Sequence, residues 1–257
     1  MHDAYAHASA LLAAPSPSAD PATSRPRFDW ARAWYPLAPL SYLEPAAPSA
    51  HTLLGRALAV WRSPATREWV VFEDRCPHRL APLSEGRVVA ATSTLQCSYH
   101  GFEFDACGAC VRIPQADSPS QERAACASRR SRAVRYPTRE AAGLLWVWLD
   151  PSNEGAGLAA AAAPALPSEM ASGEGVLLGD WMMRELPLSY EFLAENLLDP
   201  AHVHFSHHGV IGSRARAGPV ALRPRPEGAG FSMDITANKM QAGATSVTHF
   251  APPCLTW

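Results

Sequence analysis

The chain has 257 residues, of which 47% are hydrophobic and 18% charged, and its formal net charge is −2. This composition supports a sizeable hydrophobic core in one large or two smaller domains and excludes a chain that is disordered throughout. The near-neutral balance excludes a nucleic-acid-binding protein that works by neutralising phosphates, and no stretch of about 18 apolar residues is present to cross a membrane.

The first half of the chain predicts a β domain. Residues 1–27 are rich in alanine, serine and proline and predict a disordered lead or the remnant of a targeting segment. From residue 28 to residue 150, short apolar runs separated by turn residues predict a small antiparallel β domain. Residues 117–132 are polar and predict a solvated loop. The runs that predict strands are 51–62, split at Gly55-Arg56, and 68–73, 94–96, 102–104, 111–113 and 143–149.

The second half of the chain predicts a linker and a thin second domain. Residues 151–178 are dominated by alanine, glycine and proline, which is typical of an interdomain linker. Within residues 179–257 the spacing predicts a helix over 190–198, which Pro200 stops, and a strand over 231–239. One helix and about two strands bury little surface, so the pattern predicts a domain that is cut short.

The first candidate site consists of two segments, CPHRLAPLSEGR and CSYHGFEFD. Cys76 and His78 lie in the first segment, and Cys97 and His100 lie in the second. Such ligands can hold either a Cys2His2 zinc ion or a Rieske [2Fe–2S] cluster, with both cysteines on one iron and both histidines on the other. Zinc fingers pair cysteine with cysteine and place the histidine pair on a helix. The mixed segments and the predicted β context therefore favour the cluster.

The remaining cysteines give a weaker signal. Cys107 and Cys110 form a CGAC motif, which is typical of redox sites. They flank Gly108 in a predicted turn, however, and this favours a structural role. Cys126 and Cys254 have no cysteine close to them in the sequence, and we expect both to be structural.

The second candidate site is the segment ENLLDPAHVHFSHHG, which holds four histidines within seven residues. His204 and His208 are four residues apart and would share one face of a helix. His202 and His207 are five residues apart, about 140° around an ideal helix, and would need a distorted helix or a π-type turn. Pro200 makes such a distortion plausible, although spacing alone favours the first pair.

A carboxylate precedes these histidines. Asp199 lies three residues before His202 and can orient its imidazole. Non-haem Fe(II) oxygenases bind iron through two histidines and one carboxylate and leave positions open for O2. A Rieske cluster that supplies single electrons suits such an iron site.

Together these segments resemble Rieske-type non-haem iron oxygenases, over about residues 30–215. WYPLAPLSYL, LLGRALAVWR, WVVFEDR, VRIPQA and GLLWVWLD carry the resemblance further, and it is closest to one branch. That branch holds pheophorbide a oxygenase, chlorophyllide a oxygenase and the Rieske proteins of the plastid import translocon. The resemblance implies an α+β fold, in which an antiparallel β Rieske domain precedes an incomplete helix-grip-type catalytic domain at 179–257.

The resemblance also implies cofactors and roles. It assigns Cys76 and Cys97 to one iron of the [2Fe–2S] cluster and the two histidines of those segments to the other. It assigns His202 and His207 to a mononuclear non-haem Fe(II), against the spacing argument, and places Asn196 near that iron. Asp199 would link His202 to a cluster histidine of a neighbouring subunit in a ring-shaped homotrimer.

The activity implied by the resemblance is oxygenation of a chlorophyll-derived tetrapyrrole. Ferredoxin would supply the electrons, and the protein would reside in the chloroplast, associated with the envelope or the thylakoid membrane. The family's third iron ligand is a carboxylate on a helix well after the sheet, whereas only Glu227 and Asp234 follow His207 here. The alternative is therefore an electron-transfer or inactive Rieske protein that lacks a complete mononuclear iron site. Phe102 replaces the commoner tryptophan, and His204 stands where proline is usual.

Overall fold

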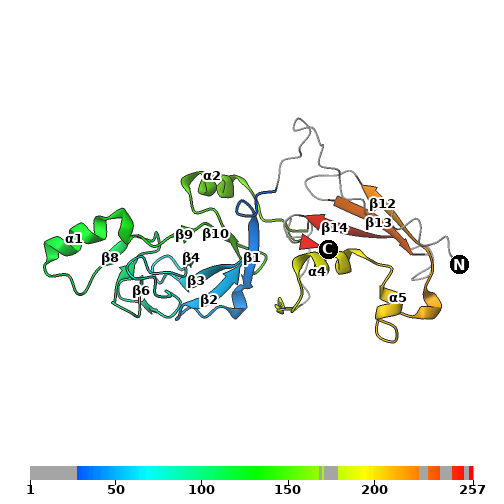
Figure 1. Cartoon of the computed structure of the whole chain (residues 1–257), viewed down its shortest axis with the longest axis horizontal. Helices are drawn as coiled ribbons and strands as arrows, with labels where there is room; N and C mark the ends of the chain where they lie inside the picture. The colour runs from blue at the N-terminus through cyan, green and yellow to red at the C-terminus, as the bar shows by residue number, and fades with distance from the viewer. Residues whose placement is uncertain are drawn as a thin grey trace, which may run out of the picture. The chain divides into compact units, whose positions relative to one another are not determined.

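The computed structural model describes residues 28–167, 170, 179–225, 231–237, 245–251 and 255–256, with side chains described as far as residue 220 (Figure 1). The lead predicted at 1–27 lies outside the described residues. The described residues 28–30 belong to a unit separate from the rest, and the rings of Phe28 and Trp30 pack edge to face there at 5.1 Å. The sheets described below belong to the second unit, residues 31–257.

A four-stranded antiparallel sheet lies at the centre of the β domain, in the order β2-β3-β4-β9. The predicted hairpin is confirmed, because Leu54 and Gly55 have φ angles of 48° and 74°, as a two-residue hairpin turn requires. Alternate residues of β3 face two separate cores, Leu58 on one side and Trp61 on the other. This burial on both faces explains the uninterrupted apolar runs. The strands are β2 (Ser49–Leu53), β3 (Arg56–Arg62), β4 (Trp69–Glu73) and β9 (Arg135–Tyr136).

A three-stranded sheet in the order β1-β11-β10 covers the first core. Leu145 and Val147 of β11 face that core, while Trp146 faces a third cluster on the outer side of the sheet. Helix α2 (Asn153–Ala161) covers this outer side, and Ala159 is fully buried there. The expected linker 151–178 thus begins with a packed helix, and its residues 168–169 and 171–178 lie outside the described residues. The strands are β1 (Trp34–Pro39), β10 (Thr138–Ala141) and β11 (Leu144–Trp148), with a 3-10 turn at Leu40–Tyr42.

Another four-stranded antiparallel sheet, in the order β5-β6-β7-β8, covers the second core. Leu95 and Phe104 are paired across β6 and β7 and are both fully buried. They pack in the same cluster as Trp61, Cys76 and Cys97. This sheet and the central one therefore carry the two candidate ligand segments toward one core. The strands are β5 (Arg87–Val89), β6 (Thr94–Gln96), β7 (Glu103–Phe104) and β8 (Cys110–Arg112).

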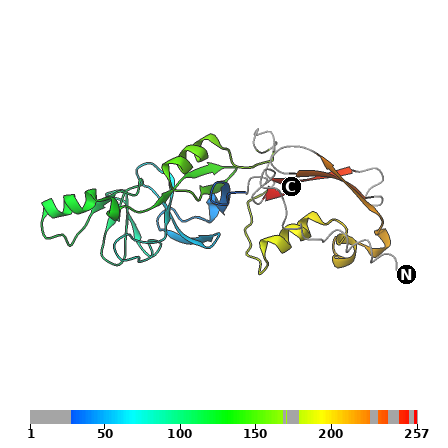
Figure 2. The same cartoon turned by 45° about the horizontal axis from the view of Figure 1, so that its top comes forward.

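The prediction of a polar loop at 117–132 is wrong, because residues Pro119–Ala127 form helix α1. The hydroxyl of Ser118 accepts a hydrogen bond from the backbone N–H of Gln121, and Pro119 occupies the first helical position. This start signal is visible in the sequence. The helix buries none of its residues fully, so no apolar stripe marked it. It projects beyond the strands of the β domain (Figures 1 and 2).

The segment after residue 179 contains helices followed by a sheet. The predicted helix 190–198 is confirmed as α4 (Tyr190–Leu198), and the predicted strand 231–239 is found as β13 (Phe231–Ala237). The short helix α5 (Val203–Ser206) and a 3-10 turn at Arg214–Arg216 follow α4. The sheet has the antiparallel order β12-β13-β14-β15. Its other strands are β12 (Val220–Arg225), β14 (Thr245–Ala251) and β15 (Leu255–Thr256).

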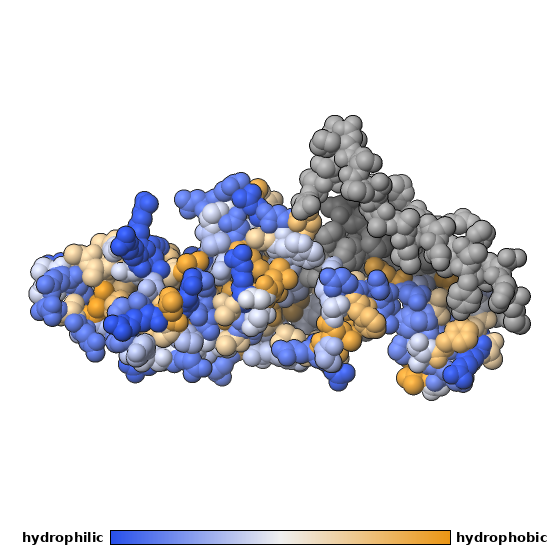
Figure 3. Space-filling view, viewed as in Figure 1, coloured by the Kyte–Doolittle hydropathy of each residue, from blue (hydrophilic) through white to orange (hydrophobic). Residues whose placement is uncertain are grey.

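Large apolar side chains are exposed over α4 and α5 (Figure 3). Val210 and Ile211, which follow α5, are 84% and 70% exposed, and Phe192 of α4 is 55% exposed. Among the described residues, no helix combines the length and the apolar character that a membrane crossing needs.

Candidate metal centres

The two predicted ligand segments form a pair of matching loops. In the first loop, Cys76 donates its backbone N–H to Ala81 O at 2.8 Å and accepts the N–H of Leu80 at 2.8 Å. In the second loop, Cys97 donates to Phe102 O at 2.8 Å and accepts the N–H of Gly101 at 3.1 Å. Leu80 and Gly101 occupy the same place and have φ angles of 60° and 72°. Each loop is thus a tight turn that presents its cysteine at the start and its histidine at the tip.

The two cysteines lie on the buried side of these loops. Cys76 and Cys97 are 2% and 3% exposed and pack in the second core. Burial raises the pKa of the Cys76 thiol to about 11, and the neighbouring Cys97 raises it in the same sense. The backbone N–H of Tyr99 points at the sulfur of Cys97 from 3.5 Å. Two thiols that face each other, with backbone N–H groups around them, are a donor set suited to an iron of a cluster.

The two histidines lie on the outer side. The rings of His78 and His100 are 4.7 Å apart between centroids, and His78 is exposed. Phe102 stacks on His78 at 4.5 Å with an angle of 7° between the rings, so the phenylalanine that replaces tryptophan still supports this histidine. Partial desolvation, together with His100 and Arg79, lowers the pKa of His78. The neutral form, which binds metals, therefore predominates at pH 7.

Sequence reasoning missed the polar network behind the second loop. Glu103 is 1% exposed, and its carboxylate accepts hydrogen bonds from Thr94 Oγ1 at 2.8 Å and from Gln96 Nε2 at 2.9 Å. Arg112 reaches the same carboxylate at 3.2 Å, and Thr92 reaches it at 3.1 Å. Gln96 directly precedes Cys97, so this network fixes the strands from which the loop leaves. The sequence signal that could have revealed this network is Glu103 itself, a single acidic residue between Phe102 and Phe104 in a predicted strand.

In the second candidate site the helix is broken, not distorted. Helix α4 ends at Leu198, and Asp199 has extended backbone angles of −99° and 97°. Pro200 lacks the N–H that a continuing helix needs. The chain then forms the single-turn helix α5, with His202 at its N-terminal cap and His207 at its C-terminal cap. Both residues lie at helix ends, where the 140° separation on an ideal helix does not apply.

This break brings two imidazoles together. The Nε2 atoms of His202 and His207 are 3.3 Å apart. Two imidazole nitrogens bound at about 2.1 Å to one metal ion, about 100° apart, lie about 3.2 Å from each other. His202 donates its Nδ1–H to the backbone carbonyl of Asp199 at 2.5 Å, which leaves the Nε2 lone pair free to bind a metal. The pair therefore fits an ion such as Fe(II).

The other two histidines are turned toward the backbone. His204 is 8% exposed, and its Nδ1 accepts the N–H of Ser213 at 3.2 Å. His208 accepts the N–H of Arg214 at 3.2 Å through its own Nδ1. The structure does not bring these two histidines together, although their spacing favoured them. They hold the chain that folds back after α5.

Two further predicted residues lie beside the His202–His207 pair. The carboxylate of Asp199 accepts the N–H of Ala201 at 2.8 Å, and its second oxygen lies 3.8 Å from His202 Nδ1. Its side chain is 53% exposed. Asn196 is exposed on the last turns of α4, one turn before Asp199.

In the described part of the chain, no three His, Cys, Asp or Glu side chains come close enough to hold one metal ion. Of the two carboxylates that follow His207, Asp234 lies on β13 and Glu227 falls outside the described residues.

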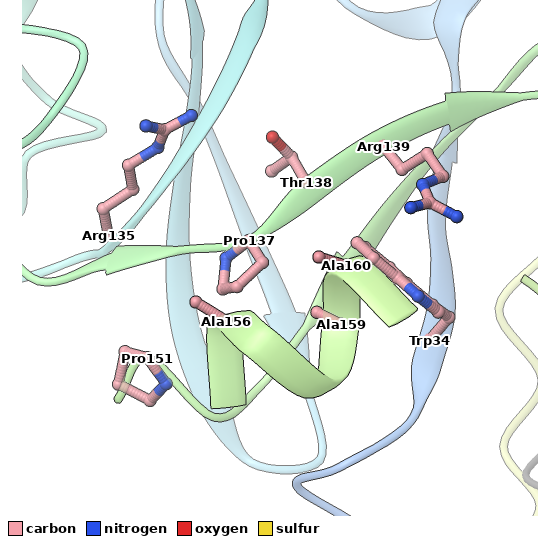
Figure 4. A pocket seen from close by; sticks show the side chains of 9 residues that line it. All are labelled: Trp34, Arg135, Pro137, Thr138, Arg139, Pro151, Ala156, Ala159 and Ala160. Carbon is pink, nitrogen blue, oxygen red and sulfur yellow. The ribbon is translucent and has the colours of Figure 1, made fainter. Parts of the chain in front are cut away.

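A separate cavity of about 390 Å³ lies between α2 and strands β9 and β10 (Figure 4). Its lining includes Trp34, Ala159 and the side chains of Arg135 and Arg139, which lie at opposite ends (Figure 4). Arg139 is held by the carbonyl of Ala162 at 2.9 Å and lies over the ring of Trp34. The cavity contains none of the predicted site residues.

Comparison with known families decides the nature of the first centre. The Rieske [2Fe–2S] domain matches residues 33–131, which include both Cys/His loops. The match favours the cluster and overturns the zinc alternative. The C-terminal domain of vanillate O-demethylase oxygenase matches residues 188–242, which include the His202–His207 pair.

The chain belongs to the Rieske-type non-haem iron oxygenases. It falls in the branch that includes pheophorbide a oxygenase, chlorophyllide a oxygenase and components of the plastid translocon. Rieske oxygenases of this family contain a [2Fe–2S] cluster and a mononuclear non-haem iron.

Individual relatives agree with this assignment. The chain is 41% identical over 238 residues to rice (Oryza sativa) pheophorbide a oxygenase. The aligned region covers 91% of this chain and 43% of the relative. It is 35% identical over 189 residues to the Arabidopsis thaliana protochlorophyllide-dependent translocon component 52, covering 72% of this chain and 32% of the relative. The chain therefore spans less than half the length of these relatives.

A solved structure shares the fold. The Pseudomonas putida CBB5 protein NdmB superposes with a TM-score of 0.67 at 24% identity, over 87% of this chain and 63% of that chain. The likeness confirms the predicted α+β fold class, in which an antiparallel β Rieske domain precedes a segment of helices and sheet.

Proposed function

We propose that this chain carries the cluster site and two iron ligands of an oxygenase that acts on a chlorophyll-derived tetrapyrrole. The observation that carries the proposal is that one chain holds both the paired Cys/His loops and two imidazoles whose Nε2 atoms converge to 3.3 Å. The 41% identity to rice pheophorbide a oxygenase supports the substrate class and a chloroplast location. Ferredoxin is the proposed electron donor.

The residue assignments are part of this proposal. Cys76 and Cys97, on the buried side of the loops, hold one iron of the cluster, and His78 and His100, on the outer side, hold the other. The matched hydrogen bonds of the two loops support this division, because each loop offers one sulfur and one imidazole from the same kind of turn. When bound, the cluster supplies single electrons and the mononuclear iron supplies the place where O2 is reduced.

His202 and His207 are the proposed ligands of the mononuclear iron. The backbone carbonyl of Asp199 fixes the tautomer of His202, so that its Nε2 carries no proton and points toward His207. Asn196 lies one turn away on α4 and is a candidate to contact substrate or the open side of the iron.

Asp199 is the proposed link between the two centres. One of its carboxylate oxygens is held by the N–H of Ala201, while the other lies beside His202, and the side chain is half exposed. It can accept a hydrogen bond from an exposed cluster histidine of a neighbouring subunit. A homotrimer with cluster and iron paired between neighbours would use this contact.

The deciding experiment measures iron, acid-labile sulfide and the electron paramagnetic resonance spectrum of anaerobically reconstituted protein. We expect a Rieske signal, and three irons per chain that fall to two in His202→Ala. His208→Ala is the matched control. It removes an imidazole from the same segment, but this imidazole accepts a backbone N–H instead of facing the proposed iron, so the variant should keep all three irons. Cys97→Ser or His100→Ala should abolish the visible absorption of the cluster.

The second candidate is an electron carrier without oxygenase turnover. It is favoured by the finding that the described residues bring two ligands, not three, to the proposed iron. Two irons per chain, a Rieske signal and no O2-dependent change in pheophorbide or chlorophyllide would establish this function. Asp199→Ala separates the two further: in the oxygenase it keeps all metals and slows turnover, and unchanged turnover contradicts the proposed link.

A further inference from the structure

Two cysteines outside the Cys/His loops lie side by side. The sulfurs of Cys110 on β8 and Cys126 on α1 are 3.7 Å apart, and both thiols are free. The two cysteines are 16 residues apart in the sequence, so neither the CGAC motif nor the isolated position of Cys126 predicted their contact. The contact exists because helix α1 lies against strand β8.

The surroundings of the two sulfurs differ. Cys110 is 4% exposed and packs in the second core, and Cys126 is half-buried at the edge of that core. A disulfide bond is about 2.05 Å long, so the sulfurs must approach each other by about 1.7 Å. Helix α1 buries none of its own residues fully, which allows it to make this small movement. Cys126 is the sulfur that solvent can reach.

We propose that Cys110 and Cys126 are an oxidisable dithiol, a modification site that a low-molecular-weight disulfide such as oxidised glutathione converts into a Cys110–Cys126 disulfide. The thiolate of Cys126 attacks the glutathione disulfide, forms a mixed disulfide and releases one glutathione thiolate. The thiolate of Cys110 then attacks the Cys126 sulfur and releases the second glutathione. Two protein thiols are oxidised, one glutathione disulfide is reduced to two thiols, and the balance needs no further reactant.

The resulting bond would fix α1 to the sheet. One of the described contacts that already join them is the hydrogen bond from the backbone N–H of Ile113, just after β8, to Glu122 of the helix at 2.9 Å. Cys126 also lines a cavity of about 590 Å³ between the helix and the sheet, together with Glu103 and Arg112. Oxidation would therefore hold one wall of this cavity in place. Burial raises the pKa of Cys110 to about 12, so the second step is slow at neutral pH.

The competing partner for Cys110 is Cys107 of the CGAC motif. Cys107 is exposed, and its backbone is held in the turn, where its N–H donates to Asp105 Oδ1 at 2.9 Å and its carbonyl accepts from Arg132 at 2.8 Å. The described structure places the sulfur of Cys126, not that of Cys107, in contact with Cys110.

The test uses the holoprotein in glutathione buffers of increasing oxidised fraction, quenched with N-ethylmaleimide and digested with trypsin. We expect a cross-link between peptide 88–112 and peptide 124–129, assigned to Cys110 and Cys126 by fragmentation, while the visible absorption of the cluster persists. In the oxidised protein, the amide hydrogens of α1 should exchange at least about tenfold more slowly, because the bond removes the open states of the helix.

Three variants make the outcome decisive. Cys126→Ser must abolish both the cross-link and the slower exchange, and Cys110→Ala must leave at most a glutathione adduct on Cys126. Cys107→Ser must change neither result. A disulfide within peptide 88–112, adducts without a cross-link, or a cross-link that appears only after cluster absorption is lost would each overturn the proposal.

Discussion

Replacing Glu103 by alanine tests whether the buried network behind the second cluster loop holds that loop in place. The substitution removes the carboxylate that accepts from the hydroxyl of Thr94 and from the amide of Gln96, and Thr94 is 2% exposed while Gln96 is half-buried. A buried polar group left unpaired costs about 1–3 kcal/mol, so we expect a loss of about 3 kcal/mol in total. Arg112 is 54% exposed and turns to water at little cost.

The matched variant is Arg112→Ala, which removes only the exposed half of the same ion pair. Its loss should be about 0.5–1 kcal/mol, because a half-exposed guanidinium is screened by solvent and Glu103 keeps its neutral donors. At about 2–4 °C per kcal/mol for a chain of this size, the midpoint falls by roughly 6–12 °C for Glu103→Ala and by less than about 4 °C for Arg112→Ala.

The assay is the temperature at which half of the visible absorption of the cluster is lost, with far-ultraviolet circular dichroism followed in parallel. Because Gln96 precedes Cys97, the Glu103 variant should release its cluster before the bulk of the β domain unfolds. Equal midpoints for the two variants, or a change below about 2 °C for Glu103→Ala, would refute the reasoning.

The remaining predictions concern single backbone and side-chain features. Gly101→Ala should lower the free energy of unfolding by about 1–2 kcal/mol and lower the temperature of cluster loss, because the φ of 72° at this position disfavours a side chain. Leu80→Gly at the matching place of the first loop should not lower that temperature. His204→Ala should destabilise the turn after α5 by about 2 kcal/mol, seen as faster amide exchange at Ser213, while the iron content stays unchanged. Burial lowers the pKa of His51, so folding stability should fall as the pH drops below about 6.5, where the unfolded chain takes up the proton first. His51→Gln should flatten this pH dependence in urea titrations, and an unchanged slope would assign the acid sensitivity to other groups.

The sequence predicted the elements whose cause is local. The hairpin at Gly55, the helix 190–198 and the strands expected at 68–73, 94–96, 102–104, 111–113 and 143–149 follow from turn residues, apolar runs and a proline stop, and the structure has them at or within a residue or two of these places. Strands β1, β5, β9 and β10 were not among the predicted runs. Helix α1 was readable from Ser118 and Pro119, but its lack of buried residues left no apolar periodicity to confirm the start signal.

The sequence by itself also favoured a Rieske cluster over zinc at the first centre, because its two cysteines and two histidines stand in mixed pairs, and the family match to residues 33–131 agrees. For the second segment the spacing of the histidines favoured the wrong pair, and the tertiary structure supplies the physical reason why the pair implied by the family resemblance meets. His202 and His207 converge because α4 ends at Leu198 and α5 is a single turn, and a spacing rule assumes one continuous helix. The tertiary structure also brings Cys126 beside Cys110. This contact depends on how helix α1 packs against strand β8, and no local sequence pattern predicts such packing between residues 16 positions apart.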